Sequence, residues 1–346
     1  MRAPPDRPNL FQFAYAEHAQ DAVLAWLLTW ADPRFEPVDA GLHAAGRLLL
    51  TRLLALYPGT GNAHVDSVKV QQQLGGVDVL VVVNEQIAVV IEDKIDSSIR
   101  KNQLDTYLAS LRATNSYRSV DGVFVKTGDQ DPVSAREVGY PVLLRHDLLH
   151  IIEEGLKAGA KHDALYEYRD RLVRFERDTA SYATQPLALW GTDENEGISW
   201  EIVRERRSRW AGFFTALQPS LLGSHWGYVP NQSGGFMGLW WASTHDGEAW
   251  TYIQLEDERL VFKLNVDDAA RRGAIRWQWH ERVLVAAQAA DLPVQRPRRF
   301  GSGTTMTAAY LEDYRQPNSS GLLNLDATLS VLRQAEHVLD AARALS

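Results

Sequence analysis

Charged residues stand at the ends of two neighbouring apolar segments, residues 77–83 and 87–94. Asp78 lies near the start of the first segment, and Glu92 and Lys94 close the second. Charged groups are rarely buried in apolar surroundings unless they are paired or bind a metal ion. Two carboxylates can hold Mg²⁺ or Mn²⁺ through oxygen ligands, and the ion can activate water and polarise a phosphoryl oxygen. These residue types therefore predict metal-assisted hydrolysis of a phosphodiester, provided that the segments bring them together.

The register of a hairpin between the two segments decides whether the charges meet. If residues 84–86 form a three-residue loop, Val83 faces Ile87, and counting back places Asp78 directly across from Glu92. The Cβ atoms of opposed residues lie roughly 5 Å apart, where like charges repel unless a cation lies between them. The hairpin therefore predicts a cation beside this pair of acids.

The alternation of side chains along a strand assigns a role to each residue of the Glu-Asp-Lys triplet. Glu92 and Lys94 share one face, whereas Asp93 points to the other face and is a spacer. Asp78 and Glu92 are candidate metal ligands, and the Lys94 ammonium can orient the attacking water and offset charge on the phosphorus. A role for Lys94 as a general base stays open. The alternative is that both acids are strand-end residues in salt bridges with Lys94.

The elements around this hairpin predict an α/β unit. A stripe of apolar residues predicts a helix that Asp32-Pro33 ends, and Pro58-Gly59 ends a second helix. Helices are expected at 13–32, 40–57 and 97–115 and from 147 onward, with strands at 65–73, 77–83, 87–94, 121–128 and 140–145. This order predicts a mixed sheet with flanking helices.

Asp78, followed after an apolar hairpin by Glu92-Asp93-Lys94, resembles the PD-(D/E)XK nuclease superfamily. The resemblance covers roughly residues 10–150, and Val77 stands where the proline of the family's name would be. It implies a restriction-endonuclease-like mixed sheet flanked by helices. It also implies a Mg²⁺- or Mn²⁺-dependent nuclease for which DNA is the favoured substrate.

Two further features extend the resemblance. Gln103 and Tyr107 match the Gln-x3-Tyr motif of RecB-type nucleases, and a spacing of four places them on one helical face. The resemblance implies that both line the active-site cleft. Superfamily members often place a metal-binding glutamate on the first core helix, which points to Glu17, with Asp21 as the substitute candidate.

The chain is expected to divide near residue 160 into a catalytic domain, residues 1–160, and an α+β accessory domain, residues 161–346. The second half predicts a helix, four strands in an antiparallel meander, a further helix, a strand and a final helix. Its concentrated basic loop, residues 295–303, can grip a nucleic-acid backbone or serve as a solvated connection. Recognition of a target, a protein partner or a second copy of the chain is assigned to this half by exclusion.

Composition narrows the classes of protein. The 346 residues are 45% hydrophobic and contain no cysteine, so a metal must be held by oxygen or imidazole ligands. The absence of cysteine also predicts a cytoplasmic protein. No apolar run approaches the roughly 20 residues that span a bilayer, which argues against a membrane role. A formal charge of −8 argues against nonspecific coating of nucleic acid.

Two functions remain from this reading. The first is a cytoplasmic nuclease, and long two-part relatives with this N-terminal pattern occur in bacteria, some of them near phage-defence functions. The second is a catalytically inactive module that keeps the nuclease fold and binds nucleic acid or a protein partner. The complete set of Asp78, Glu92, Lys94, Gln103 and Tyr107 favours the nuclease.

Overall fold

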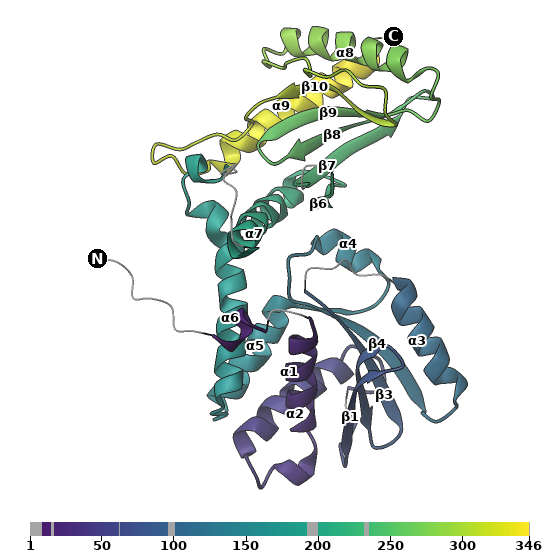
Figure 1. Cartoon of the computed structure of the whole chain (residues 1–346), viewed down its shortest axis with the longest axis vertical. Coiled ribbons are helices and arrows are strands. Elements are labelled where there is room, and N and C mark those ends of the chain that lie inside the picture. Colours follow the sequence, from purple (N-terminus) through teal and green to yellow (C-terminus); the bar gives the residue numbers. More distant parts are fainter. Residues whose placement is uncertain are drawn as a thin grey trace. The chain divides into compact units, whose positions relative to one another are not determined.

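The structure is a computed structural model that describes residues 9–14, 17–61, 63–95, 101–191, 200–231 and 235–345. The chain divides into two compact units, Met1–Arg177 and Asp178–Ser346 (Figure 1). The boundary falls later than the residue 160 expected from the sequence. The reason is helix α6 (Asp163–Ala180), which buries Leu165, Tyr168 and Leu172 in the core of the first unit.

The first unit is built on one five-stranded sheet with the strand order β1-β2-β3-β4-β5. Strands β1 to β3 pair antiparallel, whereas β3, β4 and β5 are parallel, so the predicted mixed sheet is confirmed. Its elements are α1 (Glu17–Thr29), α2 (Ala40–Leu54), β1 (Val68–Leu74), β2 (Val77–Val83), β3 (Ile87–Lys94), α3 (Lys101–Ala113), β4 (Ser119–Lys126), α4 (Pro132–Glu137), β5 (Val142–Leu144), α5 (Arg145–Lys157) and α6.

Strand β3 is buried along its whole length because helices cover both faces of the sheet. Its residues Ile87, Val89 and Ile91 pack in the core that includes α1 and α2. Its alternate residues Ala88 and Val90 pack in a separate core with α3, and Figure 1 shows α3 apart from α1 and α2. The charged end of β3 therefore lies between the two apolar cores that cover the faces of the sheet.

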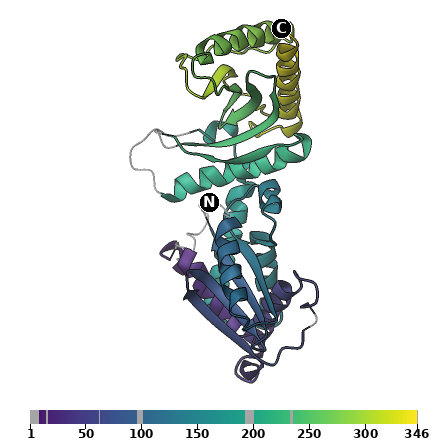
Figure 2. The same ribbon diagram turned by 90° about the vertical axis from the view of Figure 1, so that its right-hand side faces the viewer.

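The second unit carries an antiparallel five-stranded sheet with the strand order β10-β9-β8-β7-β6, which confirms the predicted meander. Figure 2 shows the same chain from the side, with helices α7 and α9 running along this sheet. None of the described helices is long and apolar enough to cross a membrane. The elements are α7 (Trp200–Leu217), β6 (His225–Val229), β7 (Phe236–His245), β8 (Trp250–Glu256), β9 (Arg259–Asn265), α8 (Arg272–Ala289), β10 (Thr305–Leu311) and α9 (Leu325–Ala344).

The two faces of this second sheet differ. On β9, Leu260, Phe262 and Leu264 belong to the large core of the second unit. The alternate residues Arg259 and Lys263 make ion pairs instead, with acids on β8 and after β10. One face of the sheet is therefore apolar, and the other carries charged side chains.

Candidate active site

The β2–β3 hairpin has the register predicted from its polar break. Val83 pairs with Ile87, and the ladder continues to Val79 opposite Ile91. Asn84 and Glu85 adopt left-handed backbone angles, with φ of 52° and 57°, which turn the chain tightly between the strands. The next step of this register brings Asp78 and Glu92 opposite each other.

Lys94 lies between the two acids at this end of the hairpin. Its Nζ atom is 2.5 Å from Oε1 of Glu92 and 3.8 Å from Oδ2 of Asp78. Asp78 is also fixed from the backbone, because its Oδ2 accepts a hydrogen bond of 2.9 Å from the Asp93 amide. Glu92 is 0% exposed and Lys94 is 8% exposed. The structure therefore joins the three residues in one cluster, in which Glu92 and Lys94 are buried and Asp78 is partly exposed.

Burial dominates the electrostatics of this cluster. It raises the pKa of Glu92, and the charge of Asp78 adds to that rise, while the hydrogen bond from Lys94 opposes it. Burial by itself lowers the pKa of Lys94, but the hydrogen bond and charge of Glu92, with the charge of Asp78, outweigh burial and raise it. The two acids therefore favour the charged ammonium form of Lys94.

One oxygen of the cluster has no partner. The Oε2 atom of Glu92 is buried and accepts no hydrogen bond from any described group. A buried polar atom that lacks a hydrogen-bond partner costs about 1–3 kcal/mol in lost hydration, and a charged atom costs more. Such an oxygen is a ready ligand for a cation that enters the site.

Glu17, the first residue of α1, also reaches this end of β3. Its Oε1 accepts a hydrogen bond of 2.9 Å from the backbone amide of Ile95. Its negative charge contributes to the raised pKa of Lys94. Helix α1 therefore places Glu17 beside the cluster, as expected of the first core helix.

The two residues of the Gln-x3-Tyr motif lie on α3. Tyr107 is half-buried in the core between α3 and the sheet. Its hydroxyl lies so close to Gly76 that a Cβ atom there would be 2.9 Å from the oxygen. Tyr107 thus packs on the turn that leads into β2, two residues before Asp78. The side chain of Gln103 lies outside the described residues.

Asp93 has a specific environment, which the interpretation of it as a spacer missed. It points to the face opposite Glu92, is 0% exposed, and accepts a hydrogen bond of 2.5 Å from Gln20 of α1. The Oε1 atom of Gln20 accepts in turn from Thr127, at 2.7 Å. Burial raises the pKa of Asp93 well above its usual range, and the nearby charge of Asp21 adds to that rise.

A sequence signal for this second group exists on α1. Gln20 precedes Leu24 and Leu27 on the apolar side of the helix and is itself 0% exposed. A buried amide among apolar neighbours must find polar partners across the fold. Asp21, the substitute candidate for Glu17, is likewise buried, and burial raises its pKa. The structure therefore places Asp21 beside Asp93, and its charge also acts on Asp78 and Glu92 of the cluster.

A second buried lysine closes the end of the sheet. Lys126 pairs with Lys94 in the parallel ladder between β3 and β4. It is 1% exposed, and its ammonium donates a hydrogen bond to the carbonyl oxygen of Ile95. This interaction and the Glu17 carboxylate hold the carbonyl and the amide of the same residue. The backbone immediately after Lys94 is thus held from two sides.

The carboxylates are not arranged as a ready-made metal cage. Within the part of the chain that the structure describes, no group of three or more His, Asp or Glu side chains is close enough to hold an ion. The acids beside Lys94 are Asp78 and Glu92, with Glu17 directed at the backbone. Comparison with protein-family models, curated proteins and solved structures found no significant match to this chain.

Proposed function

We propose that the first unit is a metal-dependent nuclease that hydrolyses phosphodiester bonds, with DNA as the favoured substrate. The observation that carries this proposal is the cluster of Asp78, Glu92 and Lys94 at the end of the β2–β3 hairpin. One oxygen of Glu92 in this cluster has no hydrogen-bond partner among the described groups. The cluster thus combines a fixed ammonium with an acid that can take a further cation.

The donor set fits Mg²⁺ or Mn²⁺, which prefer carboxylate oxygens. Asp78 and Glu92 would hold the ion, the Oε2 atom of Glu92 being the oxygen that lacks a partner. When bound, such an ion polarises the phosphoryl oxygen and lowers the pKa of water. Substrate and water would supply the remaining ligands, because Mg²⁺ keeps several waters in most protein sites.

The protein's own side chains would orient and stabilise the reacting group. Lys94 carries a proton that it can share with a phosphoryl oxygen as negative charge develops there, and removal of such a group typically costs about 10²–10³-fold in rate. Glu17 and Lys126 fix the backbone at Ile95, which keeps Lys94 at the strand end. Tyr107 packs beside the start of β2 and would support the substrate strand.

The topology supports the restriction-endonuclease-like fold that the sequence resemblance implies. The acids lie on an antiparallel hairpin, and a helix follows the lysine strand before the parallel strand β4. This order of helix, hairpin, helix and strand is the one expected for the superfamily. We therefore propose this fold for the first unit.

Cleavage assays with variants of the cluster test the proposal. Asp78→Asn, Glu92→Gln and Lys94→Met should each lower Mg²⁺- or Mn²⁺-dependent cleavage of single- and double-stranded DNA by about 10²-fold or more. The matched controls are Glu85→Gln and Lys69→Met, which alter an exposed ion pair near the turn at the opposite end of the β2–β3 hairpin. These controls should cleave as fast as the parent protein. Equal cleavage by Lys94→Met and the parent would contradict the mechanism.

A noncatalytic binding module is the second candidate, and two observations favour it. Lys94 already neutralises Glu92, and the described residues contain no group of three acids that could enclose an ion. This candidate predicts no uptake of Mg²⁺ or Mn²⁺ in isothermal titration calorimetry. The nuclease proposal predicts uptake of Mn²⁺ that Glu92→Gln abolishes and Glu85→Gln does not.

A further inference from the structure

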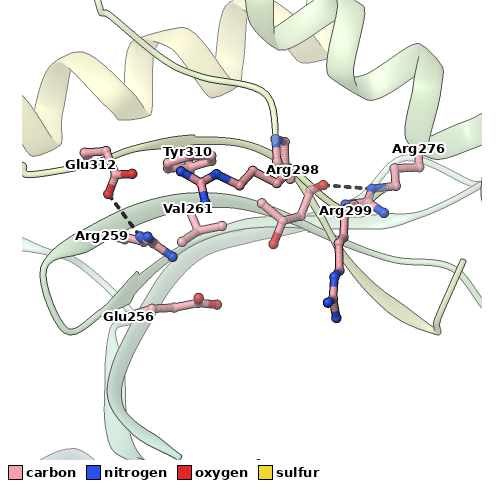
Figure 3. A pocket seen from close by; sticks show the side chains of 10 residues that line it. Glu256, Arg259, Val261, Arg276, Arg298, Arg299, Tyr310 and Glu312 are labelled. Carbon is pink, nitrogen blue, oxygen red and sulfur yellow. Dashed lines mark hydrogen bonds and ion pairs between the residues drawn. The ribbon is translucent and has the colours of Figure 1, made fainter. Parts of the chain in front are cut away.

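A pocket in the second unit brings several arginines together on the charged face of its sheet (Figure 3). It has a volume of about 410 Å³ and combines residues from β8, β9, β10, α8 and the loop before β10. We call it the arginine pocket. Its lining comprises Glu256, Arg259, Val261, Arg276, Pro297, Arg298, Arg299, Thr307, Tyr310 and Glu312.

Arg276 of α8 builds one wall of the arginine pocket. It is 4% exposed and donates hydrogen bonds to the carbonyl oxygens of Thr307, at 2.8 Å, and Gly301, at 2.5 Å. A further bond of 3.3 Å reaches the carbonyl of Arg299, and the Arg276 guanidinium lies 4.0 Å from the centre of the Phe300 ring. These contacts fix the backbone of the basic loop. They do not involve the side chains of Arg298 and Arg299.

The charges of the pocket do not balance. Arg259 pairs with Glu312 at 3.1 Å, and Glu256 pairs with Lys263 at 2.5 Å, so both acids of the lining are neutralised. Arg298 and Arg299 are exposed, and no carboxylate of the described residues lies within ion-pair distance of either guanidinium. In Figure 3 the Arg298 side chain extends along the pocket toward Tyr310, whereas Arg299 points away from it. The pocket therefore presents a surplus of positive charge.

We propose that the arginine pocket binds the phosphate groups of a nucleic-acid strand. Arginine presents a planar fork of donors that matches phosphate oxygens. Arg298 offers such a fork along the pocket, and Arg299, whose side chain points away, offers a second at its rim. The volume lies in the range of about 300–1,000 Å³ that is typical of small-molecule sites, which is room for one phosphate-bearing unit of a strand. An aromatic ring beside a basic groove suits single-stranded nucleic acid, and Tyr310 provides this ring.

The arginine geometry alone indicates a phosphate-bearing anion, and the choice of a strand rests on the proposed nuclease function. The two proposals concern different units of the chain and fail separately. Binding can be measured in EDTA, where a metal-dependent cleavage reaction does not run. Cleavage can be measured with variants of the first unit, which leave the arginine pocket intact.

Fluorescence anisotropy with a labelled single-stranded oligonucleotide in EDTA tests this inference on the full chain. Arg298→Ala/Arg299→Ala should weaken binding at least tenfold. The slope of log affinity against log salt should fall by about one to two, because each phosphate contact contributes about 0.7–1 to it. The control is Arg333→Glu, which changes the net charge by the same amount at an exposed position on α9. It should leave binding and slope unchanged.

Competition distinguishes the sources of the phosphate. Unlabelled strand should displace the probe at far lower concentration than a mononucleotide or inorganic phosphate, since several phosphates of one strand bind together. Equal binding by the parent and Arg298→Ala/Arg299→Ala would overturn the inference, as would an equal loss with Arg333→Glu. Binding of the mononucleotide without binding of the strand would overturn it as well. Arg298→Lys keeps the charge and should bind the strand more tightly than Arg298→Ala/Arg299→Ala does. This difference would exclude misfolding as the cause of the weakened binding.

Discussion

The acid cluster of the first unit and the arginine pocket of the second unit hold opposite surpluses of charge in opposite surroundings. Glu92 is 0% exposed, and its Oε2 atom is buried without a hydrogen-bond partner. Arg298 and Arg299 are exposed on a loop that Arg276 anchors from beneath. The acid cluster is therefore costly to disturb, whereas the arginines can be changed at little cost to the fold.

This difference separates stability from binding at the two sites. A buried ion pair that loses one partner leaves an uncompensated charge, which typically costs about 3–5 kcal/mol. Exposed charges interact weakly with the rest of the fold and typically contribute about 0–1 kcal/mol. Variants of the first site should therefore alter both folding and chemistry, while variants of the second should alter ligand binding alone.

The largest expected effect is that of Lys94→Met on stability. It should lower the free energy of unfolding at pH 7 by about 3 kcal/mol, because Glu92 is left buried without a counter-charge. The measurement is urea unfolding followed by tryptophan fluorescence. The loss should shrink as the pH falls, because burial raises the pKa of Glu92 and the carboxyl group then takes up a proton.

Two controls sharpen this result. Lys69→Met removes the partner of Glu85, and both side chains of that pair are well exposed. It should cost far less than Lys94→Met, because water screens an exposed ion pair. Glu92→Gln/Lys94→Met should recover most of the stability, because no buried charge then lacks a partner. A loss in Lys94→Met no larger than that in Lys69→Met would contradict the importance of burial.

An intermediate effect on stability is expected at Asp257 of the second unit. In the sequence, this residue lies between Glu256 and Arg259, which both line the arginine pocket. Burial raises its pKa to about 6, against the hydrogen bond that it accepts from the Met237 amide. The folded state therefore binds a proton that the unfolded state has already lost. The contribution of this group to stability is largest below about pH 4 and declines as the pH rises to about 6.

Asp257→Asn tests this pH dependence. Asparagine accepts the same hydrogen bond and tolerates the left-handed backbone, with φ of 48°, without carrying a charge. The gain in unfolding free energy over the parent should grow from near zero at pH 4 to on the order of 2 kcal/mol at pH 7. Asp291→Asn, at an exposed position with φ of 53°, should show no such growth. An equal gain at both pH values would contradict burial of the Asp257 charge as the cause.

The smallest effect is expected for Arg298→Ala/Arg299→Ala on stability. Surface substitutions away from buried networks usually change stability by less than about 0.5 kcal/mol. The thermal midpoint measured by circular dichroism should therefore match that of the parent. A clear drop would show that these arginines support the fold, and it would remove the contrast with the acid cluster.

The parts of the fold that local patterns specify were predictable. The polar break at residues 84–86 sets the hairpin register, and that register alone brings Asp78, Glu92 and Lys94 together. Helix α2 was predicted from its apolar stripe, although it ends at Leu54, three residues earlier than Pro58-Gly59 suggested. By contrast, α4 has six residues and too few positions to show a helical period.

Contacts between distant segments were harder to predict. The hydrogen bond between Gln20 and Asp93 depends on how α1 crosses the sheet, and no local pattern sets that packing. The late domain boundary depends on the buried side of α6 in the same way. The basic loop was visible in the sequence, but its link to Arg276 of α8 appears only when the helix and the loop are packed together.

The way Arg276 secures the basic loop has a practical consequence for engineering. It bonds to main-chain oxygens, which every amino acid possesses, and so it places no demand on the side chains at positions 298 and 299. A combinatorial library randomised at those two positions should retain expression and folding. Selection from such a library could retune which polyanion the second unit prefers without redesigning its scaffold.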